Sequence, residues 1–169
     1  MTVLETERLV LRRLSADDAE FILELLNQPS FLRYIGDKGV RNTEDAILYI
    51  QTGPVASYDR FGFGLYLVEL KDSGVSIGMC GLIKRDSLPD VDVGFAFLPD
   101  YWSRGYAFEA TAAVMKYGRQ VLGLGRIVAI TSLDNAASIK LLEKIGLRFE
   151  RLIKLTEDQP EVRLFGSTV

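Results

Sequence analysis

The chain has 169 residues, of which 48% are hydrophobic and 25% charged, a composition typical of a globular protein with one sizeable core. It contains no histidine and a single cysteine, Cys80, which excludes a Ser-His-Asp triad, the usual zinc sites and an internal disulfide, so we expect no metal. The formal charge of −3, with basic and acidic residues interspersed, does not favour nucleic acid, and without a long apolar run or a signal peptide we expect a cytoplasmic protein that does not associate with membranes.

The first part of the chain predicts one strand followed by helices. Residues 7–14 have the pattern of a strand, and Ser15 is expected to cap a helix that ends before Pro29. Residues 31–41 are expected to form a loop. A second, shorter helix is expected to run from Thr43 to Gly53-Pro54.

The middle of the chain has the period of β-strands. Residues 62–70, 75–84 and 91–98 predict an antiparallel meander, because each run is bounded by turn residues. Apolar and small side chains recur at helical spacing after Gly105, which predicts a long amphipathic helix. A strand over residues 126–131 completes a crossover, which should be right-handed with parallel strands.

The end of the chain predicts one more helix and two more strands. The helix spans residues 135–145 and has Gly146 as its C-terminal cap. The strands are expected near residues 149–155 and 162–165. Because no linker or repeat interrupts these elements, we expect a single domain over residues 1–169.

Two segments carry candidate chemistry. From Phe95 to Ala107 a strand leads through a loop into a helix start, whose free N–H groups and dipole favour a pyrophosphate. Arg104 adds a cation there, although a tight turn is the better explanation of Gly105 taken by itself. In the second segment, Asn135 is explained by helix capping alone.

In this order and spacing, the two segments resemble the GNAT superfamily of acetyl-CoA-dependent N-acetyltransferases. Gly105, Tyr106 and Ala107 match the motif Q/R-x-x-G-x-G/A, with Trp102 in place of Gln or Arg. Six further residues match N-x-x-S-x-x-L-x-E-K-x-G-F, with Leu147 in place of Phe: Asn135, Ser138, Leu141, Glu143, Lys144 and Gly146. The opening Thr6-Glu7-Arg8-Leu9-Val10-Leu11-Arg12 resembles the branch that contains the ribosomal-protein N-terminal acetyltransferases.

The resemblance implies an α+β fold, with a mostly antiparallel mixed sheet of about seven strands, flanked by four helices and splayed between two parallel central strands. Pantetheine would lie in the splay on backbone groups of Phe95, Phe97 and Leu98, with the pyrophosphate on the amides of Arg104 to Ala107. The full set of implied acetyl-CoA contacts is Phe95, Ala96, Phe97, Leu98, Trp102, Ser103, Arg104, Gly105, Tyr106, Ala107, Asn135, Ser138 and Leu141.

The implied reaction is direct attack of a neutral amine on the thioester. Asp92 is the first candidate for the general base, through water, and a solvated strand carboxylate is the alternative. Glu69 is the second candidate. The tyrosine that often acts as the acid in this family is missing from the stretch 147–149, so Ser138 is the available hydroxyl, unless the thiolate leaves without a protein acid.

The acceptor is expected to be a primary amine. Phe31, Tyr34, Ile35 and Phe63 are candidates for its pocket, with core packing as the alternative. An α-amine has a pKa of about 7.7 to 8.0 and a lysine about 10.4, so a weak base suits an N-terminal or small-molecule amine of low pKa. A non-catalytic acyl-CoA-binding module is the competing function, and both a monomer and a homodimer fit the sequence.

Overall fold

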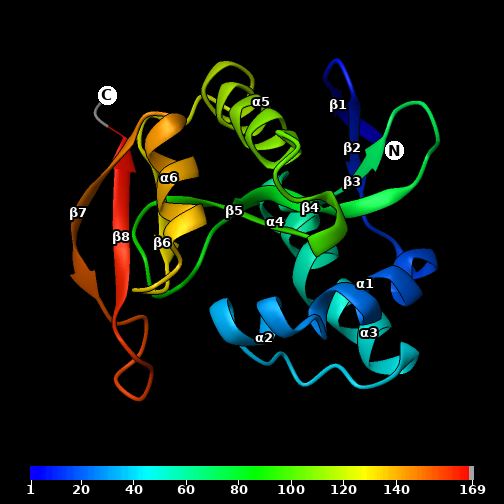
Figure 1. The fold of residues 1–169 in the computed structure, drawn as a ribbon, viewed down its shortest axis with the longest axis horizontal. Helices are drawn as coiled ribbons and strands as arrows, with labels where there is room; N and C mark the ends of the chain where they lie inside the picture. The colour runs from blue at the N-terminus through cyan, green and yellow to red at the C-terminus, as the bar shows by residue number, and fades with distance from the viewer. Residues whose placement is uncertain (168–169) are drawn as a thin grey trace.

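An eight-stranded sheet forms the centre of the molecule in the computed structural model, which describes residues 1–167 (Figure 1). The strands are β1 (Thr2–Glu5), β2 (Leu9–Arg13), β3 (Leu65–Leu70), β4 (Ser76–Ile83), β5 (Val91–Phe97), β6 (Ile127–Thr131), β7 (Leu147–Ile153) and β8 (Val162–Ser167). The α-helices are α1 (Ala19–Leu26), α2 (Pro29–Tyr34), α3 (Thr43–Ile50), α4 (Ala56–Phe61), α5 (Tyr106–Gln120) and α6 (Ala136–Lys144).

The strand order is β1-β2-β3-β4-β5-β6-β8-β7, and every neighbouring pair is antiparallel except β5 and β6. The expected α+β fold with a mixed, mostly antiparallel sheet is confirmed. The strand that the sequence did not predict is β1, a short edge strand whose residues Thr2–Glu5 pair with β2. Its four residues are too few to show a strand period by themselves.

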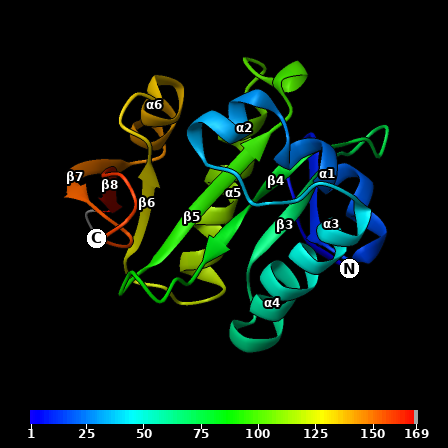
Figure 2. The same ribbon diagram turned by 90° about the horizontal axis from the view of Figure 1, so that it is seen from below.

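The two parallel strands separate soon after they begin. Only two residue pairs join them, Val91 with Ile127 and Asp92 with Val128. Beyond these pairs β5 and β6 diverge, which leaves facing edges that have no strand partner (Figure 2). The predicted splay is therefore confirmed, and Asp92 lies at its narrow end.

Helices cover both faces of the sheet. The side chains of α5 and α6 pack in one core cluster with β4, β5 and β6, and Val114 of α5 is fully buried there. Helices α1 and α3 pack on the opposite face around Leu67 and Met79. Figure 1 shows α1, α2 and α3 together on the side of the sheet away from α5. Among the described residues no helix is both long and apolar enough to cross a bilayer.

Two predictions about the helices on the N-terminal side were wrong. The first helix ends before Pro29 as expected, at Leu26. The loop expected from residue 31 is wrong in its first part, because Pro29 begins α2, where proline is well accommodated at the first helical position, and the loop starts only after Tyr34. The second helix does not end at Pro54. A π-helical turn, Gln51–Val55, carries the buried Pro54 and continues into α4, which ends at Gly62 in a left-handed conformation. The described chain thus has six α-helices where four were expected.

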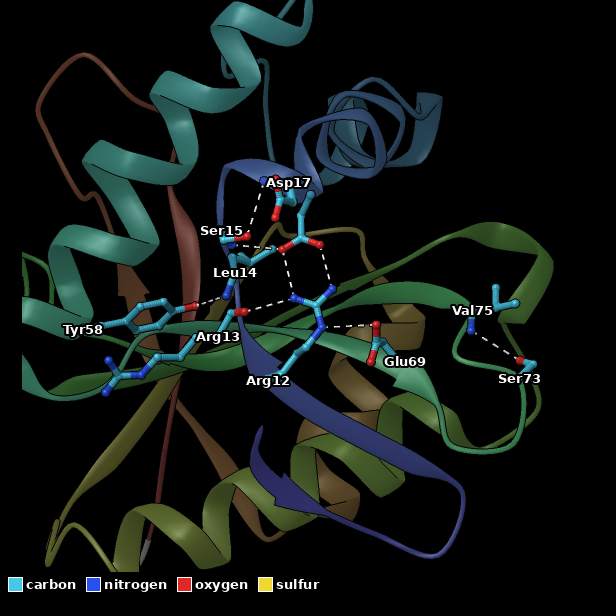
Figure 3. Close-up of polar contacts among 10 residues, drawn as sticks. Arg12, Arg13, Leu14, Ser15, Asp17, Tyr58, Glu69, Ser73 and Val75 are labelled. Atoms are coloured by element: carbon cyan, nitrogen blue, oxygen red, sulfur yellow. Dashed lines mark hydrogen bonds and ion pairs between the residues drawn. The ribbon is translucent and has the colours of Figure 1, made fainter. Parts of the chain in front are cut away.

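The connection between α4 and the sheet is made by Tyr58. Its ring stacks on Tyr66 at 5.6 Å between centroids. Its hydroxyl accepts a hydrogen bond from the Leu14 amide at 3.1 Å (Figure 3). The same hydroxyl donates to the carbonyl of Leu65. Burial raises the pKa of this phenol well above its usual value, so it stays neutral and able to donate.

Candidate active site

The junction between β5 and α5 presents uncapped backbone amides. Gly105 is the N-cap of α5, with φ +84°, and no side chain in the described part of the chain caps this helix. The first-turn amides of Tyr106 and Ala107 therefore keep their donor capacity for an external anion. A left-handed conformation at this position favours glycine, and a Cβ there would lie 3.2 Å from a guanidinium nitrogen of Arg8.

The edge of β5 that faces the splay offers a short run of free backbone groups. The Leu98 amide donates to the carbonyl of Ile77 at 2.9 Å, on the β4 side. Because backbone groups alternate between the two edges of a strand, those of Phe95 and Phe97 point toward β6. The Phe97 carbonyl accepts a hydrogen bond from the Trp102 indole at 2.8 Å, which leaves the Phe97 amide and both groups of Phe95.

Leu98 has fewer free backbone groups than the resemblance implied. The Leu98 carbonyl accepts from the Tyr101 amide at 3.0 Å, so both backbone groups of Leu98 are already bonded within the chain. Ala96 also turns its carbonyl toward β4, where it approaches Gly78. Only alternate residues of β5 can therefore pair with a ligand in the splay.

Trp102 holds the loop between β5 and α5 in place. Its indole ring is about half exposed, yet its N–H returns to the end of β5 through the bond to Phe97. The next residue, Ser103, has φ 61°, which is unusual for a residue other than glycine. Trp102 thus ties the loop to the end of β5 in this chain, where the motif usually has Gln or Arg.

The start of α6 lies at the end of β6, on the other side of the splay. The Asn135 side-chain oxygen accepts a hydrogen bond from the Ser138 amide at 3.3 Å, so Asn135 is an N-cap. The Ser138 side chain is half-buried, and within residues 1–167 its hydroxyl makes no hydrogen bond. Leu141, one turn further along α6, is half-buried as well.

Asp92 is a buried carboxylate at the narrow end of the splay. It is 1% exposed, which contradicts the alternative of a solvated strand carboxylate. Its Oδ2 accepts a hydrogen bond from Arg85 Nε at 3.0 Å, whereas its buried Oδ1 has no partner among the described residues. Burial raises the pKa of Asp92, and the positive charge and hydrogen bond of Arg85 oppose that shift.

Glu69, the second candidate for the base, lies elsewhere. It faces Ser76 at the beginning of β4, while Asp92 faces Ile83 at the end of that strand. Glu69 also accepts a hydrogen bond from Arg12 Nε at 3.2 Å (Figure 3), and the same guanidinium holds the nearly buried Asp18. The structure therefore places Glu69 outside the site, in an ion-pair network that joins β2, β3 and the start of α1.

The four predicted acceptor residues divide into two groups. Phe31 and Phe63 are 4% and 7% exposed and belong to the two core clusters, so they were wrongly assigned to a pocket. Tyr34 is half-buried and Ile35 is 48% exposed, both at the end of α2. An ion pair of Arg33 with Asp134, at 3.3 Å, joins this helix to the loop that leads into α6.

Comparison with known proteins decides the family. The family model described as an acetyltransferase (GNAT) domain matches residues 8–148. The chain belongs to the GNAT acetyltransferases. YoaA of Bacillus subtilis (strain 168), named an N-acetyltransferase, is 32% identical to this GNAT protein over 154 residues, which cover 90% of this chain and 86% of YoaA.

Solved structures of similar fold agree. An acetyltransferase from Agrobacterium tumefaciens superposes with a TM-score of 0.84 at 25% identity, covering 100% of this chain and 95% of that one. The ribosomal L7/L12 alpha-N-protein acetyltransferase RimL, in complex with coenzyme A, has a TM-score of 0.83 at 16% identity, covering 98% and 97%. The implied GNAT fold and acetyl-CoA-dependent N-acetyltransferase activity are confirmed by these matches.

The residues of this GNAT protein fit acetyl-CoA. Acetyl-CoA needs amides for its pyrophosphate and a strand edge for its pantetheine arm. The chain has both: the uncapped start of α5 and the free groups of Phe95 and Phe97 beside the splay.

Nothing in the sequence pattern indicated that Arg85 bonds Asp92, because that pairing depends on how the turn between β4 and β5 folds.

Proposed function

We propose that this GNAT acetyltransferase transfers the acetyl group to an unhindered primary amine of modest basicity, with Asp92 as the general base acting through a water molecule. The observation that carries this proposal is the Asp92 Oδ1 atom. It is buried, has no partner among the described residues and lies where β5 and β6 separate. A buried acceptor without a partner is costly unless a bound group or water satisfies it.

Acetyl-CoA, the acetyl donor, binds along the two sides of the splay. Its pyrophosphate binds the amides from Arg104 to Ala107, where the helix dipole favours negative charge. Its pantetheine arm pairs with Phe95 and the Phe97 amide as an added strand. This arrangement directs the thioester toward the narrow end of the splay, between Asp92 and the start of α6.

The chain's own groups then account for the proton transfers. Asp92 takes the amine proton through water as the amine nitrogen bonds to the acetyl carbon, so the charge that develops on nitrogen is removed. The carbon–sulfur bond breaks as the tetrahedral carbon collapses. The half-buried Ser138 hydroxyl, which the chain leaves unbonded, donates to the departing thiolate.

The strength of the base points to the class of acceptor. Near pH 7 about a tenth of an α-amine is already neutral, against about one part in 10³ of a lysine side chain. A carboxylate that acts through water is sufficient for the former. The name of RimL supports a protein N-terminus, and that of an FsC-acetyl coenzyme A-N(2)-transacetylase of Aspergillus fumigatus supports a small-molecule amine.

A screen of acceptors tests this proposal. We expect thiol release from acetyl-CoA with peptides that have free N-termini or with small amines of low pKa. Peptides with blocked N-termini and internal lysines should give no turnover, because their amines are almost fully protonated near pH 7. Preferential acetylation of internal lysines, identified by mass spectrometry, would contradict the proposed acceptor class.

The pH profile tests the role of Arg85. In Arg85→Gln the positive charge beside Asp92 is lost, so the pKa of Asp92 should rise further and the acidic limb of kcat/KM should move to higher pH. Lys38 lies close enough to Arg85 to repel it, and Tyr49, whose pKa is raised to about 12 mainly by burial, stays neutral. Neither replaces the lost ion pair.

The matched control for this experiment is Arg126→Gln. Arg126 also pairs with carboxylates, Asp90 and Glu150, but it does not contact Asp92. Its pH profile should coincide with that of the parent. An unchanged acidic limb in Arg85→Gln would exclude Asp92 as the ionising group.

A further inference from the structure

The loop that begins α5 is tied to a segment almost 100 residues earlier in the chain. Arg8 lies in the connection between β1 and β2, and its Nε donates to Glu109 Oε1 of α5 at 2.7 Å. The Arg8 backbone amide donates to the other oxygen of Glu109 at 2.9 Å. The Thr6 hydroxyl donates to that same oxygen, so Glu109 is held by three donors.

The rest of the Arg8 guanidinium reaches the loop itself. One terminal nitrogen donates to the Arg104 carbonyl at 3.0 Å. The guanidinium carbon lies 4.3 Å from the centre of the Tyr106 ring, a cation–π contact. A Cβ on Gly105 would meet the other terminal nitrogen at 3.2 Å. Arg8 therefore contacts Arg104 and Tyr106, and its guanidinium occupies the space that a side chain at Gly105 would enter.

We infer that Arg8 is a positioning residue for acetyl-CoA. With Glu109 it forms a clamp that fixes the Arg104 carbonyl on the side of the loop that faces Arg8. The amides on the opposite side of the loop then face the pyrophosphate. This inference rests on the proposed seat of the pyrophosphate at Arg104 to Ala107. We call the group Thr6, Arg8 and Glu109 the N-terminal clamp.

The charges of the N-terminal clamp are arranged to hold at neutral pH. Hydrogen bonding and attraction to Glu109 raise the pKa of Arg8. Burial tends to raise the pKa of Glu109, but the donors Thr6 and Arg8 together lower it below its ordinary value. Both groups are therefore ionised wherever an amine acceptor is reactive.

A clamp of this kind acts by preorganisation. An unfixed loop must lose conformational freedom when the ligand binds, and the affinity falls accordingly. Arginine suits the role because its planar fork bonds Glu109 and the Arg104 carbonyl at once while its face rests on Tyr106. A lysine ammonium carries the same charge but cannot make these contacts together.

The experiment compares the binding of two acetyl donors, acetyl-CoA and S-acetylpantetheine, and does not require the amine acceptor to be known. Arg8→Ala should weaken acetyl-CoA binding about tenfold by calorimetry, the equivalent of one charge-assisted hydrogen bond. The dissociation constant of S-acetylpantetheine, which lacks the pyrophosphate, should not change when it is measured by displacement titration against acetyl-CoA. Arg8→Lys should behave like Arg8→Ala, and Arg126→Ala, which removes an arginine paired with Asp90 and Glu150, should behave like the parent.

Hydrogen–deuterium exchange supplies the second measurement. In free Arg8→Ala the first hydrogen-bonded amides of α5 should exchange faster than in the parent, beginning with that of Glu109, which donates to the Gly105 carbonyl at 3.0 Å, with α6 and the sheet unaffected. Unchanged acetyl-CoA affinity, an equal loss for both donors, or full affinity in Arg8→Lys would overturn the inference. The proposed pyrophosphate seat is tested separately, because acetyl-CoA must slow exchange at Arg104 to Ala107 in the parent itself; without that protection the seat is wrong whatever Arg8 does.

Discussion

Gly105→Glu is expected to lower the affinity for acetyl-CoA by at least about 100-fold, since each 1.4 kcal/mol of lost interaction is a factor of ten. Gly105 has φ +84°, a conformation that costs other residues about 1–2 kcal/mol. The new side chain would begin 3.2 Å from the Arg8 guanidinium, would disturb the bond that Arg8 donates to the Arg104 carbonyl, and would add a negative charge to the loop proposed for the pyrophosphate. Strain and like-charge repulsion therefore act in the same direction.

The control variant is Gly123→Glu, measured in the same calorimetric titration. Gly123 also has a positive φ, +70°, and no atom lies within 4 Å of the position of its Cβ. It carries the same change of charge and a similar backbone strain, in the turn that follows α5. We expect Gly123→Glu to bind acetyl-CoA like the parent. A folded Gly105→Glu protein with parental affinity would show that the pyrophosphate binds elsewhere.

Asp92→Asn is expected to lower kcat by about 10²-fold or more at neutral pH, within the usual range for a general base. Acetyl-CoA affinity should remain nearly intact, because the proposed contacts of the donor are made by β5 and α5. As the pH rises, more of the amine is neutral without help, so the difference from the parent should shrink. The pH dependence of kcat for both proteins, with urea denaturation as the check of folding, measures this.

Two further variants serve as comparisons for Asp92→Asn. Asp90→Asn changes a neighbouring carboxylate that pairs with Arg126 and is one-third exposed, and its kcat should match that of the parent. Ser138→Ala should lower kcat at every pH, because bonding the departing thiolate does not depend on the ionisation of the amine. Equal rates for Asp92→Asn and the parent across the pH range would remove Asp92 from the mechanism.

Much of the fold followed from local patterns. Strand and helix periodicity from residue 62 onward predicted the meander, the crossover and α5 nearly as the structure has them. Periodicity succeeds there because each element has one buried side, and burial of that side dictates the spacing of apolar residues. It failed after Pro29, where a loop was expected although this proline begins α2. It failed again at Pro54, which was interpreted as a helix end although it is accommodated in a π-helical turn.

The sequence by itself also determined the family and the donor. The two motifs around Gly105 and Asn135 depend on backbone conformation and helix capping, which are local properties and leave a clear trace in residue type and spacing. Through their resemblance to the GNAT motifs they indicated that the acetyl group comes from acetyl-CoA. The residues that bind the amine acceptor leave no comparable local pattern in the sequence.

What only the tertiary structure decided is the fate of each charged side chain. Asp92 and Glu69 are both carboxylates on strands of one sheet. Asp92 is buried at the splay and bonded to Arg85, whereas Glu69 lies at the other end of the strands and is bonded to Arg12. Arg8 meets Glu109 across 101 positions of sequence. Ion pairs and burial depend on distances between distant segments, and because a charge has no periodic signature along the chain, only folding reveals which partner it meets.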